Sequence, residues 1–224
     1  TKATMLLLGR SKLFDEPASC VNAHTDVELK RALLADAKAQ GVMPKPAELG
    51  AQVRAILSSR EVRGTIAAIN AAGGRAEYRP VSILDAKSVA TTLAEARTWG
   101  PITGLVHGAG VLADKKIVDQ TDEQFDRVFN TKVEGFRTLL KETAKDKLRA
   151  ICTFSSISAR TGNNGQSTYA IANEVLNKMC WAEYRRRSNC VVKSIGWGPW
   201  EGGMVTAGIK ARFEAMGVPL IPID

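Results

Sequence analysis

Short apolar runs alternate with longer stretches of helical periodicity along this sequence. Each run is apolar throughout rather than alternately apolar and polar, which is typical of strands buried on both faces. Strands that alternate with helices form a parallel sheet, so we expect an α/β protein with helices on both faces of its sheet. The expected strands lie at residues 4–8, 78–84, 102–107, 149–155 and 190–197.

Capping residues mark where several of the intervening helices begin. Asp85 precedes a helical pattern as an N-cap residue does. Thr121 and Gln124 form a capping box, which predicts a helix from there to about residue 145. Two further helices are expected from apolar residues at helical spacing, at 26–40 and 49–69.

Composition excludes several classes of protein. Of the 224 residues 45% are hydrophobic and 24% are charged, which is usual for a globular chain and unlike a disordered one. No apolar run approaches the ~20 residues of a membrane helix, and we expect no signal peptide. Four cysteines without a CxxC pair and two histidines argue against a disulfide scaffold and a metal site. We expect a cytoplasmic protein that binds no metal.

The net charge of +8 has two interpretations. Scattered Lys and Arg side chains on helix surfaces are often only solvated. Alternatively, the charge serves an anionic partner, namely a phosphorylated cofactor, an acidic carrier protein or a nucleic acid. The densest basic run, 185–187, lies at an expected helix end, where cations favour the helix dipole, so it does not require a nucleic acid.

Small residues follow four of the expected strands. In an open α/β sheet, ligands bind beyond the carboxyl ends of the strands. A single glycine there is most simply a tight turn, whereas four such segments at one sheet edge favour a binding site. The segments are 9–11, 107–110, 155–156 and 197–200.

Three polar residues lie on faces of helices where apolar residues are expected. Lys132 shares a face with Phe129 and Phe136, so it must extend to solvent, find a partner or serve a function. Tyr169 and Asn173 lie one helical turn apart on another such face. Taken singly, each has a purely structural interpretation, such as a core tyrosine with a satisfied hydroxyl.

Together these residues fit the reduction of a ketone. That reaction needs a hydride donor, a proton donor for the developing alkoxide and a group that orients the carbonyl. A tyrosine is a proton donor near neutral pH if a nearby ammonium lowers its pKa, and a serine hydroxyl holds the carbonyl oxygen. We therefore expect Lys132 to lower the pKa of Tyr169.

The sequence resembles the ketoreductase domains of polyketide and fatty-acid megasynthases over nearly its whole length. These domains are short-chain dehydrogenases/reductases, so the resemblance implies a Rossmann-like doubly wound parallel sheet. Most short-chain reductases carry a lysine four residues after the tyrosine, whereas Asn173 holds that place here and Lys132 lies on the preceding helix. That exchange is a specific mark of the megasynthase ketoreductases. The matching segments are 106–111, 132–135, 154–156, 165–173 and 197–200.

The resemblance implies a role for each matching residue. Tyr169 would donate the proton, Ser156 would hydrogen-bond the β-keto oxygen, Lys132 would contact the nicotinamide ribose, and Asn173 would complete the tetrad. Arg10 would bind the 2′-phosphate of NADPH. Ser82 stands where the family usually has an aspartate, which weakens the adenine contact. The implied cofactor-binding residues are Gly9, Arg10, Ser11, Ser82, Ile83, His107, Gly108, Ala109, Lys132, Tyr169, Trp197, Gly198 and Pro199.

The resemblance also implies the substrate. It would be a β-ketoacyl thioester on an acyl carrier protein, reduced as by a 3-oxoacyl-[acyl-carrier-protein] reductase beside other domains of one synthase, with no nucleic acid and no membrane. Asp114, Gln166 and Met204 would control the substrate and its stereochemistry, and Asp114 favours the 3R alcohol. The alternative is a catalytically silent scaffold or docking domain with this fold.

We expect residues 1–224 to form a single ketoreductase domain, a fragment of a larger synthase, with a helical insertion at about 12–60. The insertion favours a polyunsaturated fatty-acid synthase over a polyketide synthase. The family's first strand, glycine-rich phosphate loop and helix would precede Thr1, and its last elements would follow Asp224. Without that loop, the resemblance predicts weak cofactor binding by the isolated chain.

Overall fold

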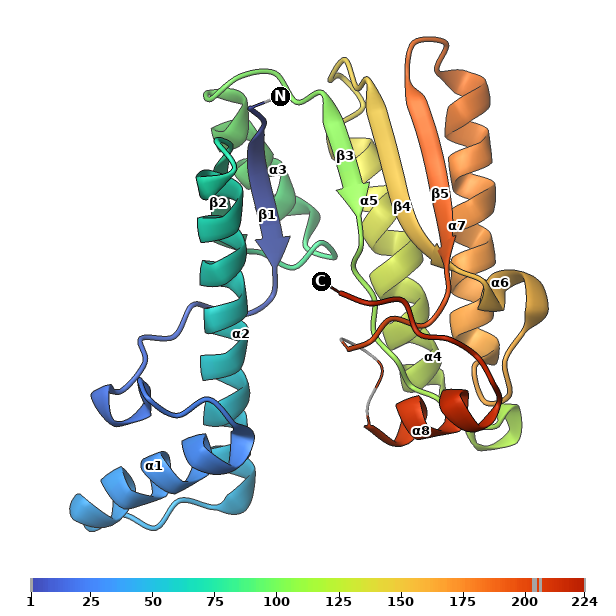
Figure 1. Ribbon diagram of the computed structural model, residues 1–224. Coiled ribbons are helices and arrows are strands. Elements are labelled where there is room, and N and C mark those ends of the chain that lie inside the picture. The colour runs from blue at the N-terminus through green and yellow to red at the C-terminus, as the bar shows by residue number, and fades with distance from the viewer. Residues whose placement is uncertain (1, 203–204, 206, 224) are drawn as a thin grey trace. The chain divides into compact units, whose positions relative to one another are not determined.

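The computed structural model describes residues 2–202, 205 and 207–223 (Figure 1). The chain divides into two compact units, one up to Ser82 and one from Ile83 onward. Each contains parallel strands joined through helices, which confirms the expected α/β class. That residues 1–224 act as one domain stays a prediction.

The first unit is a parallel strand pair with a long helical crossover. The strands run in register from Thr4 opposite Arg75 to Gly9 opposite Pro80. The second strand was expected at 78–84 but begins earlier, because Gly73, at φ +81°, ends the preceding helix there. Pro80 lacks the N–H that would continue the ladder. The elements are β1 (Thr4–Gly9), η1 (Ala18–Cys20), α1 (Asp26–Ala39), α2 (Pro46–Ala71) and β2 (Arg75–Pro80).

The helical insertion has a hydrophobic core of its own. Arg60 ties the segment before α1 to α2, since it donates to the carbonyl oxygens of Ala23 at 2.6 Å and Cys20 at 2.8 Å. Its guanidinium also pairs with Glu16, and this interaction lowers the pKa of the Glu16 carboxyl. The buried core residues are Cys20, Ala23, Leu29, Leu33, Val53 and Ile56.

The second unit is built on a three-stranded parallel sheet in the order β3-β4-β5. Its helices connect successive strands, as parallel pairing requires. The strands are β3 (Gly104–His107), β4 (Ala150–Ser156) and β5 (Val191–Trp197). The helical elements are α3 (Ala86–Arg97), η2 (Ile117–Asp119), α4 (Asp122–Phe129), the π-helical turn η3 (Asn130–Glu134), α5 (Gly135–Glu142), α6 (Ser158–Thr161), α7 (Ser167–Arg186) and α8 (Ala207–Ala215).

Helices cover one face of this sheet in the described part of the chain. Ile151 and Thr153 are buried on the face against which α5 and α7 pack (Figure 1). On the opposite face Val106 is 66% exposed and Phe154 is 37% exposed. We expected a parallel sheet with helices on both faces. In the described residues the strand pairings form a two-stranded parallel sheet in the first unit and a three-stranded one in the second.

The predicted caps are confirmed. Asp85 accepts a hydrogen bond from the Ser88 amide at the start of α3. Thr121 and Gln124 form the capping box of α4, with side chain-to-backbone distances of 3.3 and 3.2 Å. The helix expected over 121–145 is, however, interrupted by the π-helical turn η3 and ends at Glu142.

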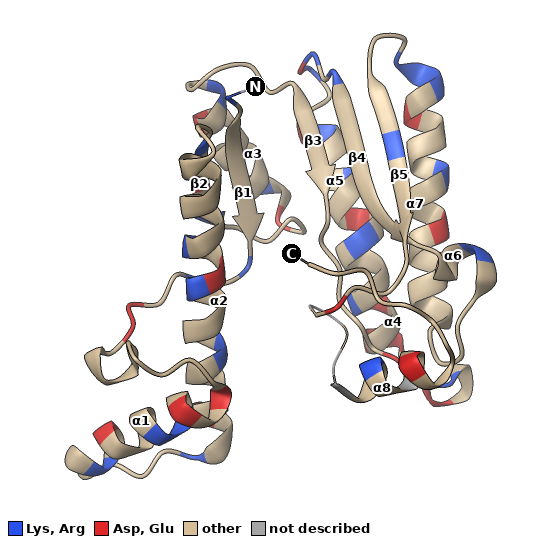
Figure 2. Ribbon diagram, viewed as in Figure 1, with Lys and Arg blue, Asp and Glu red and all other residues tan. Residues whose placement is uncertain are grey.

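Acidic and basic side chains are interspersed along the helices (Figure 2). Several form ion pairs one turn apart, such as Lys30 with Asp26 and Arg137 with Glu134. This mixture fits the interpretation of a solvated surface for much of the positive charge. No helix in the described ranges is long and apolar enough to cross a membrane.

Candidate active site

Lys132 is buried in the π-helical turn η3, with 3% of its surface exposed. Its Nζ donates a hydrogen bond to the carbonyl oxygen of Phe154 on β4, at 3.0 Å. Burial lowers the pKa of Lys132 to about 8, so the side chain is mostly an ammonium at neutral pH. Of the three possibilities for a lysine on an apolar helix face, Lys132 therefore finds a partner: its side chain points into the protein, towards the end of β4.

Tyr169 and Asn173 approach this lysine from α7. The Lys132 Nζ lies 5.5 Å from the centroid of the Tyr169 ring. The Asn173 amide donates to the Tyr169 carbonyl oxygen at 2.8 Å, and the Asn173 carbonyl oxygen accepts from Ser155 at 3.2 Å. Asn173 is fully buried, so these contacts fix the start of α7 against the end of β4.

Ser156 stands at the end of β4, next to the same tyrosine. The backbone N–H and the hydroxyl of Ser158 both donate to its Oγ, at 3.2 and 2.9 Å. Since that oxygen accepts two hydrogen bonds, the Ser156 hydroxyl remains a donor, and it lies within hydrogen-bonding reach of the Tyr169 side chain. The structure thus gathers all four predicted tetrad residues.

The pKa of Tyr169 is raised, which contradicts the expectation that Lys132 lowers it. Burial is the largest cause, and the polar side chains of Asn173 and Ser156 oppose it. The carboxylate of Asp114 raises the pKa further. A buried phenol with a raised pKa stays protonated at neutral pH, so Tyr169 is a proton donor and not a phenolate before reaction.

A small hollow beside Tyr169 contains two of the residues predicted to act on the substrate. The Gln166 amide donates to the Asp114 carboxylate at 2.8 Å. Sequence reasoning missed Gln120, whose side-chain oxygen accepts from Thr168 at 2.6 Å and so holds the start of α7. A glutamine just before a helix cap carries no signal of that contact. Met204, the third predicted residue, lies outside the described residues.

The predicted cofactor residues of the second unit lie in three segments. Gly108 is exposed and Ala109 is half-buried after β3, whereas the side chain of His107 is buried and turned towards η3. Ile83 packs against the start of α5, where a Cβ on Gly135 would lie 2.4 Å from the Ile83 Cδ1. The remaining residues are Trp197, Gly198 and Pro199 at the end of β5, all half-buried.

Two buried polar atoms in this region have no hydrogen-bond partner among the described residues. They are the side-chain oxygen of Asn173 and the indole Nε1 of Trp197. Asn173 lies beside the Tyr169–Lys132 pair, and Trp197 lies at the carboxyl end of β5. A bound polar group at this edge would satisfy both atoms. The residues present therefore fit a ligand with both donors and acceptors, such as the nicotinamide riboside end of a dinucleotide.

The other predicted cofactor residues belong to the first unit. Arg10 is exposed just beyond β1, and its guanidinium takes part in none of the hydrogen bonds or ion pairs found in the described part of the chain. The hydroxyl of Tyr78 donates to the Ser11 carbonyl oxygen at 2.6 Å and would contact a Cβ on Gly9. Ser82 is half-buried at the end of this unit.

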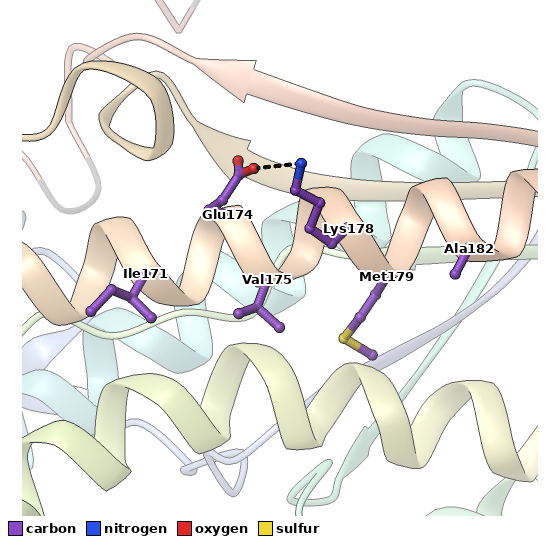
Figure 3. A pocket seen from close by; sticks show the side chains of 6 residues that line it. All are labelled: Ile171, Glu174, Val175, Lys178, Met179 and Ala182. Atoms are coloured by element: carbon purple, nitrogen blue, oxygen red, sulfur yellow. Dashed lines mark ion pairs between the residues drawn. The ribbon is translucent and has the colours of Figure 1, made fainter.

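A hollow of about 450 Å³ lies on α7, lined by residues of that helix other than Tyr169 and Asn173 (Figure 3). Ile171, Val175 and Met179 project from one side of the helix, while Glu174 and Lys178 form an ion pair at 3.2 Å beside them. The other lining residues are apolar, and the two charged side chains are engaged in their own ion pair. We therefore place the candidate site at Tyr169.

The fold and this tetrad define a short-chain dehydrogenase/reductase of the ketoreductase type. A family model described as the KR domain matches residues 36–202, and the chain belongs to that family. The chain is 41% identical, over 97% of its length, to a polyunsaturated fatty acid synthase polypeptide from Thraustochytrium sp. (strain ATCC 26185 / S-3). It is 35% identical over 55% of its length to erythronolide synthase EryA2 from Saccharopolyspora erythraea.

A solved ketoreductase domain from the bacillaene assembly line has a similar fold, with a TM-score of 0.63 and 29% identity over 73% of this chain. The chain spans 8% and 3% of the length of the two synthases, and 41% of that solved chain. The resemblance to megasynthase ketoreductases is thus confirmed at the level of the domain family.

Proposed function

We propose that this chain reduces the β-keto group of a 3-ketoacyl thioester, carried on an acyl carrier protein, to the 3-hydroxyacyl thioester with NADPH. The observation that carries this proposal is the placement of the buried Lys132 ammonium beside the Tyr169 ring, with Asn173 one turn along α7. The same tetrad supports catalysis over a silent scaffold, because a scaffold has no need of a buried lysine, which is costly.

Each member of the tetrad has a separate task. The Ser156 hydroxyl donates to the substrate carbonyl oxygen and fixes its position. When bound, NADPH supplies the hydride that adds to the keto carbon. The resulting alkoxide takes the hydroxyl proton of Tyr169, and the Lys132 ammonium stabilises the tyrosinate that remains. Asn173 holds the backbone of Tyr169, so the phenol keeps its direction.

The raised pKa of Tyr169 suits this order of events. The phenol is protonated before the hydride arrives, and it loses its proton only to a strong base such as an alkoxide. The nearby ammonium then pairs with the negative charge at the moment that charge forms. We assign the 2′-phosphate of NADPH to Arg10, whose planar guanidinium suits a phosphate.

The proposed product is the 3R alcohol, formed in the cytoplasm. Asp114 supports this stereochemistry through its resemblance to the family motif. Its hydrogen bond from Gln166, in the hollow beside Tyr169, is consistent with that assignment. The neighbouring domains of the synthase would supply the ketoacyl chain and consume the hydroxyacyl product. Relatives that are synthases far longer than this chain support this setting.

The test is NADPH oxidation with a short β-ketoacyl thioester, measured on this chain in its natural sequence context. We expect activity in the wild type and a loss of about 100-fold or more in Tyr169→Phe, which keeps the ring and removes the proton. A folded wild type that binds NADPH but reduces no ketoacyl thioester would overturn the proposal in favour of the scaffold. The configuration of the alcohol, read by chiral chromatography, tests the 3R assignment.

A further inference from the structure

The residue that the proposed reaction depends on most lies in the least regular part of its helix. Lys132 is the central residue of the π-helical turn that interrupts the α4–α5 helix. Such turns are uncommon, and they leave backbone carbonyls out of the regular α-helical hydrogen-bond pattern. Within the turn the Lys132 carbonyl oxygen accepts from the Gly135 amide. A second donor from outside the helix would further fix the direction of the Lys132 backbone.

His107, at the end of β3, makes that contact. Its Nε2 lies 2.9 Å from the carbonyl oxygen of Lys132, and 2% of the residue is exposed. A carbonyl oxygen only accepts hydrogen bonds, so Nε2 carries the proton and donates. Burial lowers the pKa of His107 to about 4, which keeps the ring neutral and in this tautomer at neutral pH.

The imidazole ring is itself held in place. It stacks on Phe136 of α5, with ring centroids 5.5 Å apart and an interplanar angle of 11°. Phe136 is fully buried. His107 therefore spans from β3 to both the π-helical turn and the helix that follows it, and its ring has no freedom to turn towards a ligand.

We propose that His107 is a positioning residue: by donating to the Lys132 carbonyl it holds the π-helical turn that directs the lysine ammonium at Tyr169. Two neighbouring strands then fix the lysine at its two ends. His107 on β3 holds the backbone, and the Phe154 carbonyl on β4 accepts from Nζ. The catalytic consequence rests on the proposed function, whereas the positioning itself does not.

The test compares two variants of nearly equal length and shape. His107→Gln places an amide N–H about where the imidazole Nε2–H lies, and His107→Met has no donor there. Thr153→Val is the matched control, because Thr153 is the register partner of His107 on β4 and is also buried, but it bonds to Cys180 and Ser194 rather than to η3.

The first readout is the titration of the Lys132 ammonium, followed by NMR with nitrogen-labelled lysine and assigned through Lys132→Met. We expect the titration of Lys132 to move by about one pH unit or more towards its ordinary value in His107→Met, because a freed turn admits water. We expect it to stay in place in His107→Gln and in Thr153→Val. An unchanged titration in folded His107→Met would overturn the proposal.

The second readout is kinetic. We expect kcat to fall about 10- to 100-fold in His107→Met with a KM for the thioester within twofold, and to recover in His107→Gln. If the wild type proves inactive, the proposed function fails. The titration of Lys132 in the His107 variants still tests whether His107 positions the lysine. If His107→Met does not fold, His107→Phe takes its place, since it keeps the ring on Phe136 without the donor.

Discussion

His107 is buried as a neutral imidazole, and this burial makes the second unit sensitive to acid. Its pKa falls from 6.5 to about 4 on folding, so the unfolded chain binds the proton more readily between those values. Stability is therefore present above pH 6.5 and is lost as the pH falls towards 4. We expect wild type to lose about 2 kcal/mol more than His107→Gln between pH 7.5 and pH 5.

This loss is measured by urea unfolding at several pH values. All four tryptophans lie beyond residue 83, so their fluorescence reports on the second unit alone. His107→Gln keeps the carboxylates and removes only the imidazole, which separates the histidine from general acid unfolding. Parallel loss of stability in the two proteins would contradict the prediction.

Lys132 determines how the activity depends on pH on the alkaline side. Burial lowers its pKa from 10.5 to about 8, so its positive charge is present below pH 8 and is lost above it. We expect kcat for ketoacyl reduction to fall above pH 8 with the titration of a single group. Lys132→Arg retains a charge over that range, so its residual activity has no limb near pH 8. A limb that persists in Lys132→Arg belongs to another group.

At this scale the sequence predicts where a polar residue lies better than its protonation. Lys132 was expected among apolar neighbours, and it is buried there. His107 was grouped with the strand-end glycines as a cofactor contact, yet it shares the buried face of β3 with Leu105. Side chains alternate between the two faces of a strand, so the buried face can be predicted only when the register of the strand is known. The raised pKa of Tyr169 depends on tertiary burial, which local spacing does not contain.

Among the elements, the junction of the π-helical turn with α5 depends on a close approach. A Cβ on Gly135 would lie 2.4 Å from Cδ1 and 2.9 Å from Cγ1 of Ile83. We expect Gly135→Ala to destabilise the second unit by about 1–2 kcal/mol, because overpacking outweighs the gain of about 1 kcal/mol in helix propensity. Tryptophan fluorescence during urea unfolding measures this loss.

A double-mutant cycle with Ile83→Ala identifies the cause. Ile83→Ala removes both close atoms, so adding Gly135→Ala in that background should cost nothing or should stabilise the unit. Gly208→Ala serves as the control, because a Cβ on that glycine, in helix α8 of the same unit, meets nothing within 4 Å. An equal cost of Gly135→Ala with and without Ile83 would exclude the clash as its origin.

The helices show where local signals suffice. The caps at Asp85 and Thr121 are short-range contacts, and they were predicted correctly. The π-helical turn was not predicted, because Phe125, Phe129 and Phe136 have spacings that an uninterrupted α-helix satisfies. The turn receives a hydrogen bond from His107, which lies 25 residues away in the sequence. A local pattern therefore does not predict the π-helical turn.

For the whole molecule, strand identity was predictable and strand pairing was not. Five apolar runs gave five strands, although β2 lies upstream of its expected place. The apolar runs do not predict which strands are neighbours, because any two of these strands could form a parallel ladder. The structure pairs β1 with β2 in the first unit and β4 with β3 and β5 in the second. The boundary between units at Ser82 likewise has no signal in composition.

The net charge of +8 also belongs to the whole molecule, and it bears on the proposed carrier-bound substrate. Long-range attraction between a basic domain and an acidic carrier protein weakens with salt, because the screening length is about 10 Å at 0.1 M and shorter above it. We expect the KM for a carrier-bound ketoacyl thioester to rise about threefold or more between 50 and 300 mM KCl.

The same ketoacyl group on a small, uncharged thiol is the control, measured with saturating NADPH so that cofactor binding does not contribute. Its KM should change little over this range, because no extended charged surface approaches the domain. Equal salt dependence for both substrates would mean that salt acts on the site itself. No dependence for either would assign the positive charge to solvated helix surfaces, where it is interspersed with acidic groups (Figure 2).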